Sequence, residues 1–300
     1  MIRLDAATVL LQWSVGGLFF LWFTTRRREL GLGYGWLLRV TFLLMAGGAL
    51  ACGAAFGFVP VRDVAAGLVA VSALAVLVVS IVLRRAGVSG ADAEHDRRTA
   101  RVAEMTGIDR APAAGVSGAG VSGAGVSGAG GREFPPSLDL IAPAVGLVGL
   151  VAAGVDAAPG GSWNMALSLL RTIVGAAFLG SVTDAMLLGH WYLVQPGLPR
   201  KHLNELVRAL GFVWPVEVAA LLLPVGMIAV WTGEVDDGWG GTLGWFWGAC
   251  AVTTIVLVYV TRAALKERYY SAVMAAPGLL YLAILTAFGT DLIARAVLSG

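Results

Sequence analysis

Long apolar runs constrain this chain more than any other feature of its sequence. A bilayer core about 30 Å thick needs about 20 mostly apolar residues per helix, and lipid offers no other partner for the backbone polar groups. We therefore predict an all-α integral membrane protein, a polytopic bundle of eight transmembrane helices. The eight runs cover residues 6–25, 34–58, 64–83, 138–157, 163–194, 205–231, 242–261 and 270–297.

The composition agrees with that class. Hydrophobic residues make up 58% of the chain and charged residues 13%, whereas soluble domains have about 45–50% and about 25%. The two cysteines exclude a disulfide-stapled scaffold, and the net charge of +2 gives no reason to expect a nucleic-acid partner. Of the 21 basic residues 19 are arginines, which is typical of a GC-rich bacterial genome. We expect a multi-pass protein of the bacterial inner membrane.

The basic residues orient the predicted bundle. With helices that alternate in direction, 16 of the 21 fall on one side, in residues 26–28, 84–137, 196–208 and 262–268. The 232–240 loop on the other side carries three acidic residues and no basic one. By the positive-inside rule we predict that the basic segments are cytoplasmic and that both termini are outside.

One segment does not belong to the membrane. Residues 84–137 separate three helices in 1–83 from five in 138–300, and the pentapeptide GVSGA occurs three times in tandem over 115–129. Such a sequence buries too little surface to fold, so we expect a flexible cytoplasmic insertion. The chain has no phosphate-binding loop followed by Lys-Ser/Thr, no HExxH and no CxxC. We therefore expect no metal site and, more readily than an enzyme, a protein that functions within its bundle.

Three predicted spans carry an acidic residue, namely Asp184, Glu217 and Asp291. A charge in hydrocarbon costs about 2.5–3.5 kcal/mol, so each is a candidate functional group. Counted from the predicted helix ends, Asp184 and Glu217 lie about 16 and about 20 Å from the cytoplasmic side, on consecutive antiparallel helices. We predict that they pair near the midplane, where one carboxyl keeps a proton unless a cation binds between them. The alternative is a structural hydrogen-bonding role for each.

His190 is the only histidine within a predicted span, close to the cytoplasmic end, where an imidazole could connect the pair to water. We group Thr183, Tyr192 and Trp214 with these residues as a proton, cation or substrate site.

The other intramembrane charges suggest structural roles. We expect an ion pair that involves Asp291, Arg295 and Arg171, which lie at similar depths. Near the cytoplasmic surface, Arg200, Lys201 and Arg208 are predicted to contact anionic lipid headgroups.

The favoured function is translocation of protons, a cation or a small solute through the paired carboxylates, without a cofactor. The first alternative is a non-catalytic membrane subunit of a redox complex, in which His190, Trp191 and Tyr192 contact a quinone. Haem fits less well, because His190 has no second span histidine to complete bis-His ligation. The second alternative is a structural or assembly partner within a membrane complex.

Overall fold

The computed structural model describes residues 5–86, 133–158, 161–194, 198–267 and 270–298. Most of the predicted insertion, with its GVSGA repeats, lies outside the described residues. The described chain is helical and contains no strand. Its α-helices are α1 (Ala6–Thr25), α2 (Leu32–Phe56), α3 (Pro60–Val82), α5 (Ile141–Asp156), α6 (Ser162–Val194), α7 (Lys201–Leu222), α8 (Gly226–Thr232), α9 (Thr242–Lys266) and α10 (Tyr270–Leu298). Two 3₁₀ segments, η1 (Leu83–Ala86) and η2 (Pro136–Leu140), border the insertion.

Within these residues, seven helices are long and apolar enough to cross a membrane, with η2 and α5 counted as one. An eighth span results if α7 and α8 are taken together, although they are bent by 56° at their junction. Long apolar helices are what a polytopic membrane protein requires. The span count of eight and the outer position of the termini stay predictions.

The predicted continuous helix over 205–231 is wrong. Helix α7 ends at Leu222, Leu223 is extended, and α8 begins at Gly226. Pro224 causes this break, because it lacks an amide hydrogen and disfavours helical geometry at the residue before it. Gly226 then adopts a φ of +43°, and a Cβ atom there would collide with the carbonyl oxygen of Leu221. Pro215, in contrast, lies inside α7.

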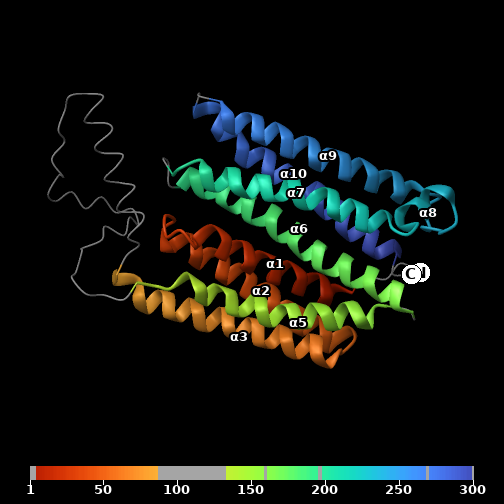
Figure 1. Ribbon diagram of the computed structural model, residues 1–300, viewed down its shortest axis with the longest axis horizontal. Helices are drawn as coiled ribbons and strands as arrows, with labels where there is room; N and C mark the ends of the chain where they lie inside the picture. The colour runs from red at the N-terminus through yellow and green to blue at the C-terminus, as the bar shows by residue number, and fades with distance from the viewer. Residues whose placement is uncertain (1–4, 87–132, 159–160, 195–197, 268–269, 299–300) are drawn as a thin grey trace.

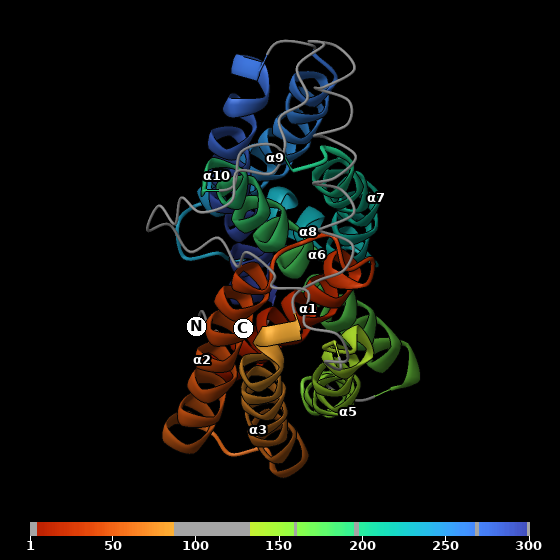
Figure 2. The same ribbon diagram turned by 90° about the vertical axis from the view of Figure 1, so that its left-hand side faces the viewer.

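Helix α6 is the centre of the bundle. It packs against α1 and α5 on one side and against α7 and α10 on the other, and Figures 1 and 2 show it between the two groups of helices. Helices α1 and α6 approach closely because Gly16 and Gly180 face one another. A Cβ atom on either would collide with backbone of the facing helix. Acidic residues on α6 are consequently enclosed on several sides.

The two ends of the bundle differ in charge. The basic end carries Arg26–Arg28 after α1 and Lys201 at the start of α7. The acidic end carries Asp5 before α1 and Asp236 in the loop after α8. In Figure 1, helix α8, the start of α1 and the end of α10 lie at the acidic end.

Candidate functional site

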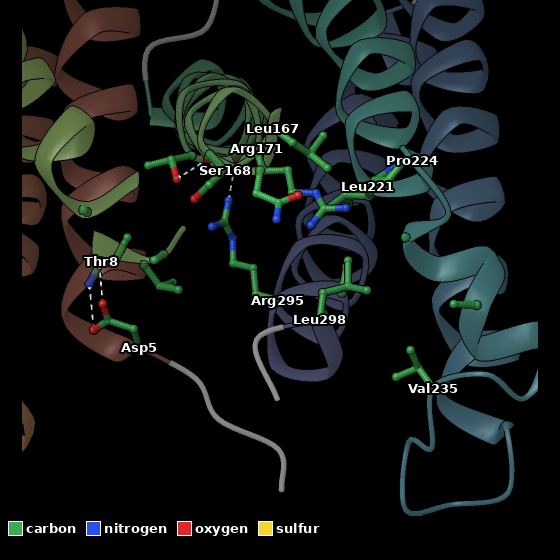
Figure 3. Close-up of a pocket in the computed structure, with 18 residues that line it drawn as sticks. Asp5, Thr8, Leu167, Ser168, Arg171, Leu221, Pro224, Val235, Arg295 and Leu298 are labelled. Carbon is green, nitrogen blue, oxygen red and sulfur yellow. Dashed lines mark hydrogen bonds between the residues drawn. The ribbon is translucent and has the colours of Figure 1, made fainter. Parts of the chain in front are cut away.

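A cavity of about 380 Å³ lies at the acidic end, beside the break between α7 and α8. Its walls come from the start of α1, the end of α5, the first half of α6, the α7–α8 junction and the end of α10. Polar side chains in the lining include Asp5, Ser168, Arg171 and Arg295, shown in Figure 3. The volume is near the lower end of the usual range for small-molecule sites, about 300–1,000 Å³.

Arg171 of α6 stabilises the helix break. Its Nε donates a hydrogen bond to the Ala220 carbonyl at 3.0 Å, and its Nη2 donates to the Leu223 carbonyl at 2.5 Å. Carbonyl groups at a helix C-terminus have no partner within their helix, so the guanidinium replaces the missing donors. In the described part of the chain, Arg171 forms no ion pair with a carboxylate. Its charge is therefore not cancelled by direct contact.

Arg295 and Asp291 form a buried ion pair within α10. The Arg295 Nε donates to both carboxylate oxygens, at 2.8 and 2.9 Å, and Nη2 donates to the main-chain oxygen of Arg171 at 2.9 Å. Gly175 of α6 leaves room for the pair, because a Cβ atom there would come within 2.9 Å of an Asp291 oxygen. Two of the three residues predicted for an ion pair are thus joined directly, and Arg171 contributes its backbone.

Glu217 of α7 is fully buried and receives no hydrogen bond from an N–H or hydroxyl donor of the described residues, but its carboxyl group lies within hydrogen-bonding reach of the Asp291 carboxyl. It faces Asp291 and interacts electrostatically with Arg295 and Arg171. We call these four residues the acid–arginine cluster. Because Arg171 and Arg295 also line the cavity, Glu217 lies one side chain away from it.

Gln12 of α1 borders the same region. Its Nε2 donates to the Thr172 carbonyl at 2.6 Å, whereas its buried Oε1 has no hydrogen-bond partner among the described residues. Buried polar atoms nearly always have a partner, either protein or ordered water. The unmet hydrogen-bonding capacity of Gln12 and Glu217 therefore marks this region as one that can receive water or a ligand.

Asp184 occupies a second buried position. It is fully buried on α6, and both of its oxygens lack hydrogen-bond partners in the part of the chain described. It interacts electrostatically with Tyr34 of α2, whose hydroxyl is also buried and lies near the Thr24 hydroxyl. Asp184 lies 13 residues beyond Arg171 in the chain, which is about 20 Å along a helix.

The structure brings Glu217 together with Asp291 and gives no contact between Glu217 and Asp184. The difference comes from the helix ends. Asp184 is 10 residues from Val194, where α6 ends, or about 15 Å; Glu217 is 16 residues from Lys201, where α7 begins, or about 24 Å. The sequence analysis began this helix at residue 205 instead of Lys201. It therefore underestimated the distance of Glu217 from the helix start and placed the two acids at too similar a depth.

Three other residues predicted for the site form hydrogen bonds within the protein. Thr183 accepts from Trp13 Nε1 at 2.7 Å and donates to the Leu179 carbonyl at 2.7 Å. The hydroxyl of Tyr192 donates to the Pro199 carbonyl, and Trp214 Nε1 donates to the Ala251 carbonyl at 3.0 Å. These bonds give each side chain a role in holding helices and loops together. His190 is exposed on α6, away from the enclosed Asp184.

The residues predicted to contact lipid headgroups differ in their surroundings. Arg200 donates to the Glu267 carbonyl, and Lys201 forms an ion pair with Glu29 at 2.7 Å. Arg208 is exposed and has no ion pair with a described residue. Of the three, only Lys201 has its charge balanced by a carboxylate of the described residues.

Glu29, in the loop after α1, also contacts His202 at 2.7 Å. Partial burial raises the pKa of Glu29, but hydrogen bonds from Lys201 and His202 and their charges outweigh it, so the net pKa lies below its ordinary value. This cluster fastens the start of α7 to the α1–α2 loop.

Two parts of the polar interior escaped the sequence analysis. Arg39 of α2 donates to both oxygens of Asp139 at 2.8 and 2.7 Å, and both side chains are buried. The presence of Arg39 within the predicted span 34–58 was the available signal. For the cavity, the signal was Pro224 and Gly226 within the predicted span 205–231.

The described residues contain no group of three or more His, Cys, Asp or Glu side chains that could hold a metal ion. The Nε2 of His202 is occupied by Glu29, and His190 is exposed. The chemistry of the site rests on buried carboxyl and guanidinium groups.

No protein family matches this chain, and neither a curated protein nor a solved structure matches it.

Proposed function

We propose that the protein is a polytopic membrane transporter that moves a small solute in a proton-coupled cycle. The cavity at the acidic end is the solute site, and Glu217 is the group that gains and loses the proton. The observation that carries this proposal is the position of Glu217, which is fully buried beside the Asp291 carboxyl and interacts electrostatically with the two arginines that line the cavity.

The charges of the acid–arginine cluster supply the coupling. Arg295 is neutralised by Asp291, so the protonation of Glu217 decides whether the charge of Arg171 is balanced. An ionised carboxylate without hydrogen bonds costs far more to bury than its neutral form. Proton binding at Glu217 and solute binding at the cavity therefore change the same local charge, and each must affect the affinity for the other.

The broken helix supports a transport role. Discontinuous helices at the binding sites of secondary transporters expose backbone groups and separate two segments that can move differently. Here α7 and α8 meet at an angle of 56°, and Arg171 donates hydrogen bonds to the carbonyls of Ala220 and Leu223 at the break. A change in the charge around Arg171 would act directly on the geometry of the break.

Asp184 provides a second proton-exchanging group toward the basic end. In this proposal the two acids predicted from sequence act in succession at different depths. Arg171 and Asp184 are about 20 Å apart along α6, so proton transfer between the two positions requires water between them. The buried hydroxyl of Tyr34 lies near the second position.

Transport can be tested with proteoliposomes loaded with a pH-sensitive dye, to which a panel of small organic acids, amines and neutral solutes is added. We expect at least one solute to change the luminal pH in the wild type at a rate that depends on an imposed pH gradient. Glu217→Gln should remove that dependence. Glu205→Gln is the matched control, because Glu205 pairs with Arg27 at the basic end at 2.6 Å. Wild-type vesicles in which no solute changes the luminal pH, or an unaltered Glu217→Gln, would contradict the proposal.

A further inference from the structure

The donors that face the cavity define its chemistry. Arg171 uses Nε and Nη2 for backbone carbonyls, and Arg295 uses Nε and Nη2 for Asp291 and the Arg171 carbonyl. The Nη1 group of each has no hydrogen bond to a described residue. Both side chains line the cavity. Two guanidinium nitrogens from neighbouring helices are therefore available to one ligand.

The charges around the cavity favour an anionic group at Arg171. Asp291 is engaged by Arg295 at 2.8 Å. Asp5, the acidic residue in the lining, lies across the cavity beside Thr8 and is held by Arg62 at 2.7 Å. Arg62 also pairs with Asp63, so the α1 side of the cavity has no spare positive charge. An anion is attracted to the α6 side, where Arg171 has no carboxylate in contact among the described residues.

The remaining walls are largely apolar. Leucine, valine and alanine side chains surround the space next to the arginines. They are Leu167, Leu221, Ala229, Val235 and Leu298. A small volume with apolar walls and a few convergent polar groups is typical of sites for small organic molecules, in which the polar groups fix orientation. A ligand with one charged group and an apolar body matches this division.

We infer that the cavity binds a small organic monocarboxylate, with its carboxylate on the Nη1 groups of Arg171 and Arg295 and its apolar body against the leucine and valine walls. Guanidinium groups are the preferred partners of carboxylates because their planar N–H donors match the two oxygens. This inference deepens the proposed function and rests on it for the location of the site. It is tested by binding alone, without transport.

The test uses isothermal titration calorimetry on the full chain in phosphatidylcholine nanodiscs. Benzoate is the probe, and benzamide is its neutral counterpart of nearly the same shape. We expect saturable binding of one benzoate per chain and binding of benzamide weaker by about tenfold or more, since a charge-assisted pair is lost. Equal binding of the two, or no benzoate binding, would overturn the inference.

Substitutions at Ser168 locate the bound probe without removing an arginine that supports the fold. Ser168 lines the cavity one turn before Arg171 on α6. Ser168→Asp places a carboxylate where it competes for Arg171 and should weaken benzoate binding about tenfold or more. Ser168→Asn adds nearly the same shape as Ser168→Asp without the charge, so it is the reference against which the weaker benzoate binding of Ser168→Asp is measured. Equal affinities of the two variants would overturn the inference even if the protein binds benzoate.

Native mass spectrometry from phosphatidylglycerol nanodiscs separates a lipid headgroup from a soluble ligand. Retention of phosphatidylglycerol by the wild type but not by Ser168→Asp, together with no benzoate binding, would assign the cavity to lipid and overturn the inference. A chain that binds benzoate but shows no solute-driven change of luminal pH would keep this inference and lose the transport proposal. A chain that transports another solute but does not bind benzoate would keep the transport proposal and lose this inference.

Discussion

Arg295 binds both carboxylate oxygens of Asp291, one turn away on α10, at 2.8 and 2.9 Å. This pair neutralises Asp291 within the bundle, whereas Glu217, whose carboxyl lies beside that of Asp291, forms no ion pair with a guanidinium of the described residues. The two carboxyl groups of the cluster therefore have different roles. Asp291, which Arg295 binds, is structural, whereas Glu217 is available for proton exchange.

Arg295→Met should destabilise the protein by about 3–5 kcal/mol, because it leaves the carboxylate of Asp291 buried without a partner. The double variant Arg295→Met with Asp291→Leu should recover most of that loss, since no buried charge remains. Unfolding in mixed detergent micelles measures both. A double variant no more stable than Arg295→Met would show that the pair is not the source of the loss.

Gly226→Ala should disrupt the α7–α8 junction. The substitution forces a residue with a Cβ atom to a φ of +43° and into the Leu221 carbonyl, and strain of the backbone alone costs about 1–3 kcal/mol. Gly240→Ala is the control, because Gly240 has a φ of +62° with nothing within 4 Å of the added atom. We expect a lower melting temperature for Gly226→Ala than for Gly240→Ala. Equal melting temperatures would show that the clash between the added Cβ atom and the Leu221 carbonyl does not destabilise the protein, and would contradict this prediction.

Asp184→Asn should leave stability unchanged or raise it by about 1 kcal/mol, because a buried acid without hydrogen bonds is replaced by a neutral group of the same shape. Solute-driven proton movement should nevertheless fall. Asp291→Asn gives the comparison, since it breaks the pair with Arg295 and should lower stability. A destabilised Asp184→Asn would indicate that Asp184 has a structural partner.

Acid should weaken the contact between the α1–α2 loop and α7. The folded state lowers the pKa of Glu29 from its ordinary value of 4.5. Its contribution to stability is therefore complete above that value and is lost as pH falls through the lower folded pKa. The melting temperature of wild type should exceed that of Glu29→Gln at neutral pH, and the two should converge at low pH. A constant difference across the titration would contradict this role of Glu29.

The sequence was sufficient for the helical spans but not for their interior contacts. Runs of apolar residues bounded by charges set the helix ends to within a few residues, since the bilayer thickness fixes the length needed. The break at Pro224 was missed because the apolar composition continues across it. The pairing of Glu217 was missed because α7 begins at Lys201 and α10 is distant in the chain. A shift of a few residues in a helix start moves a side chain by several ångströms and turns it to another neighbour.

The most direct test of the central claim is proton entry into proteoliposomes loaded with a pH-sensitive dye, recorded as the transported solute is added. We predict that the wild type acidifies the lumen, that Glu205→Gln does the same, and that Glu217→Gln gives no acidification beyond that of empty liposomes. Solute-driven acidification of equal rate in Glu217→Gln and wild type would contradict the assignment of Glu217 as the proton-exchanging group.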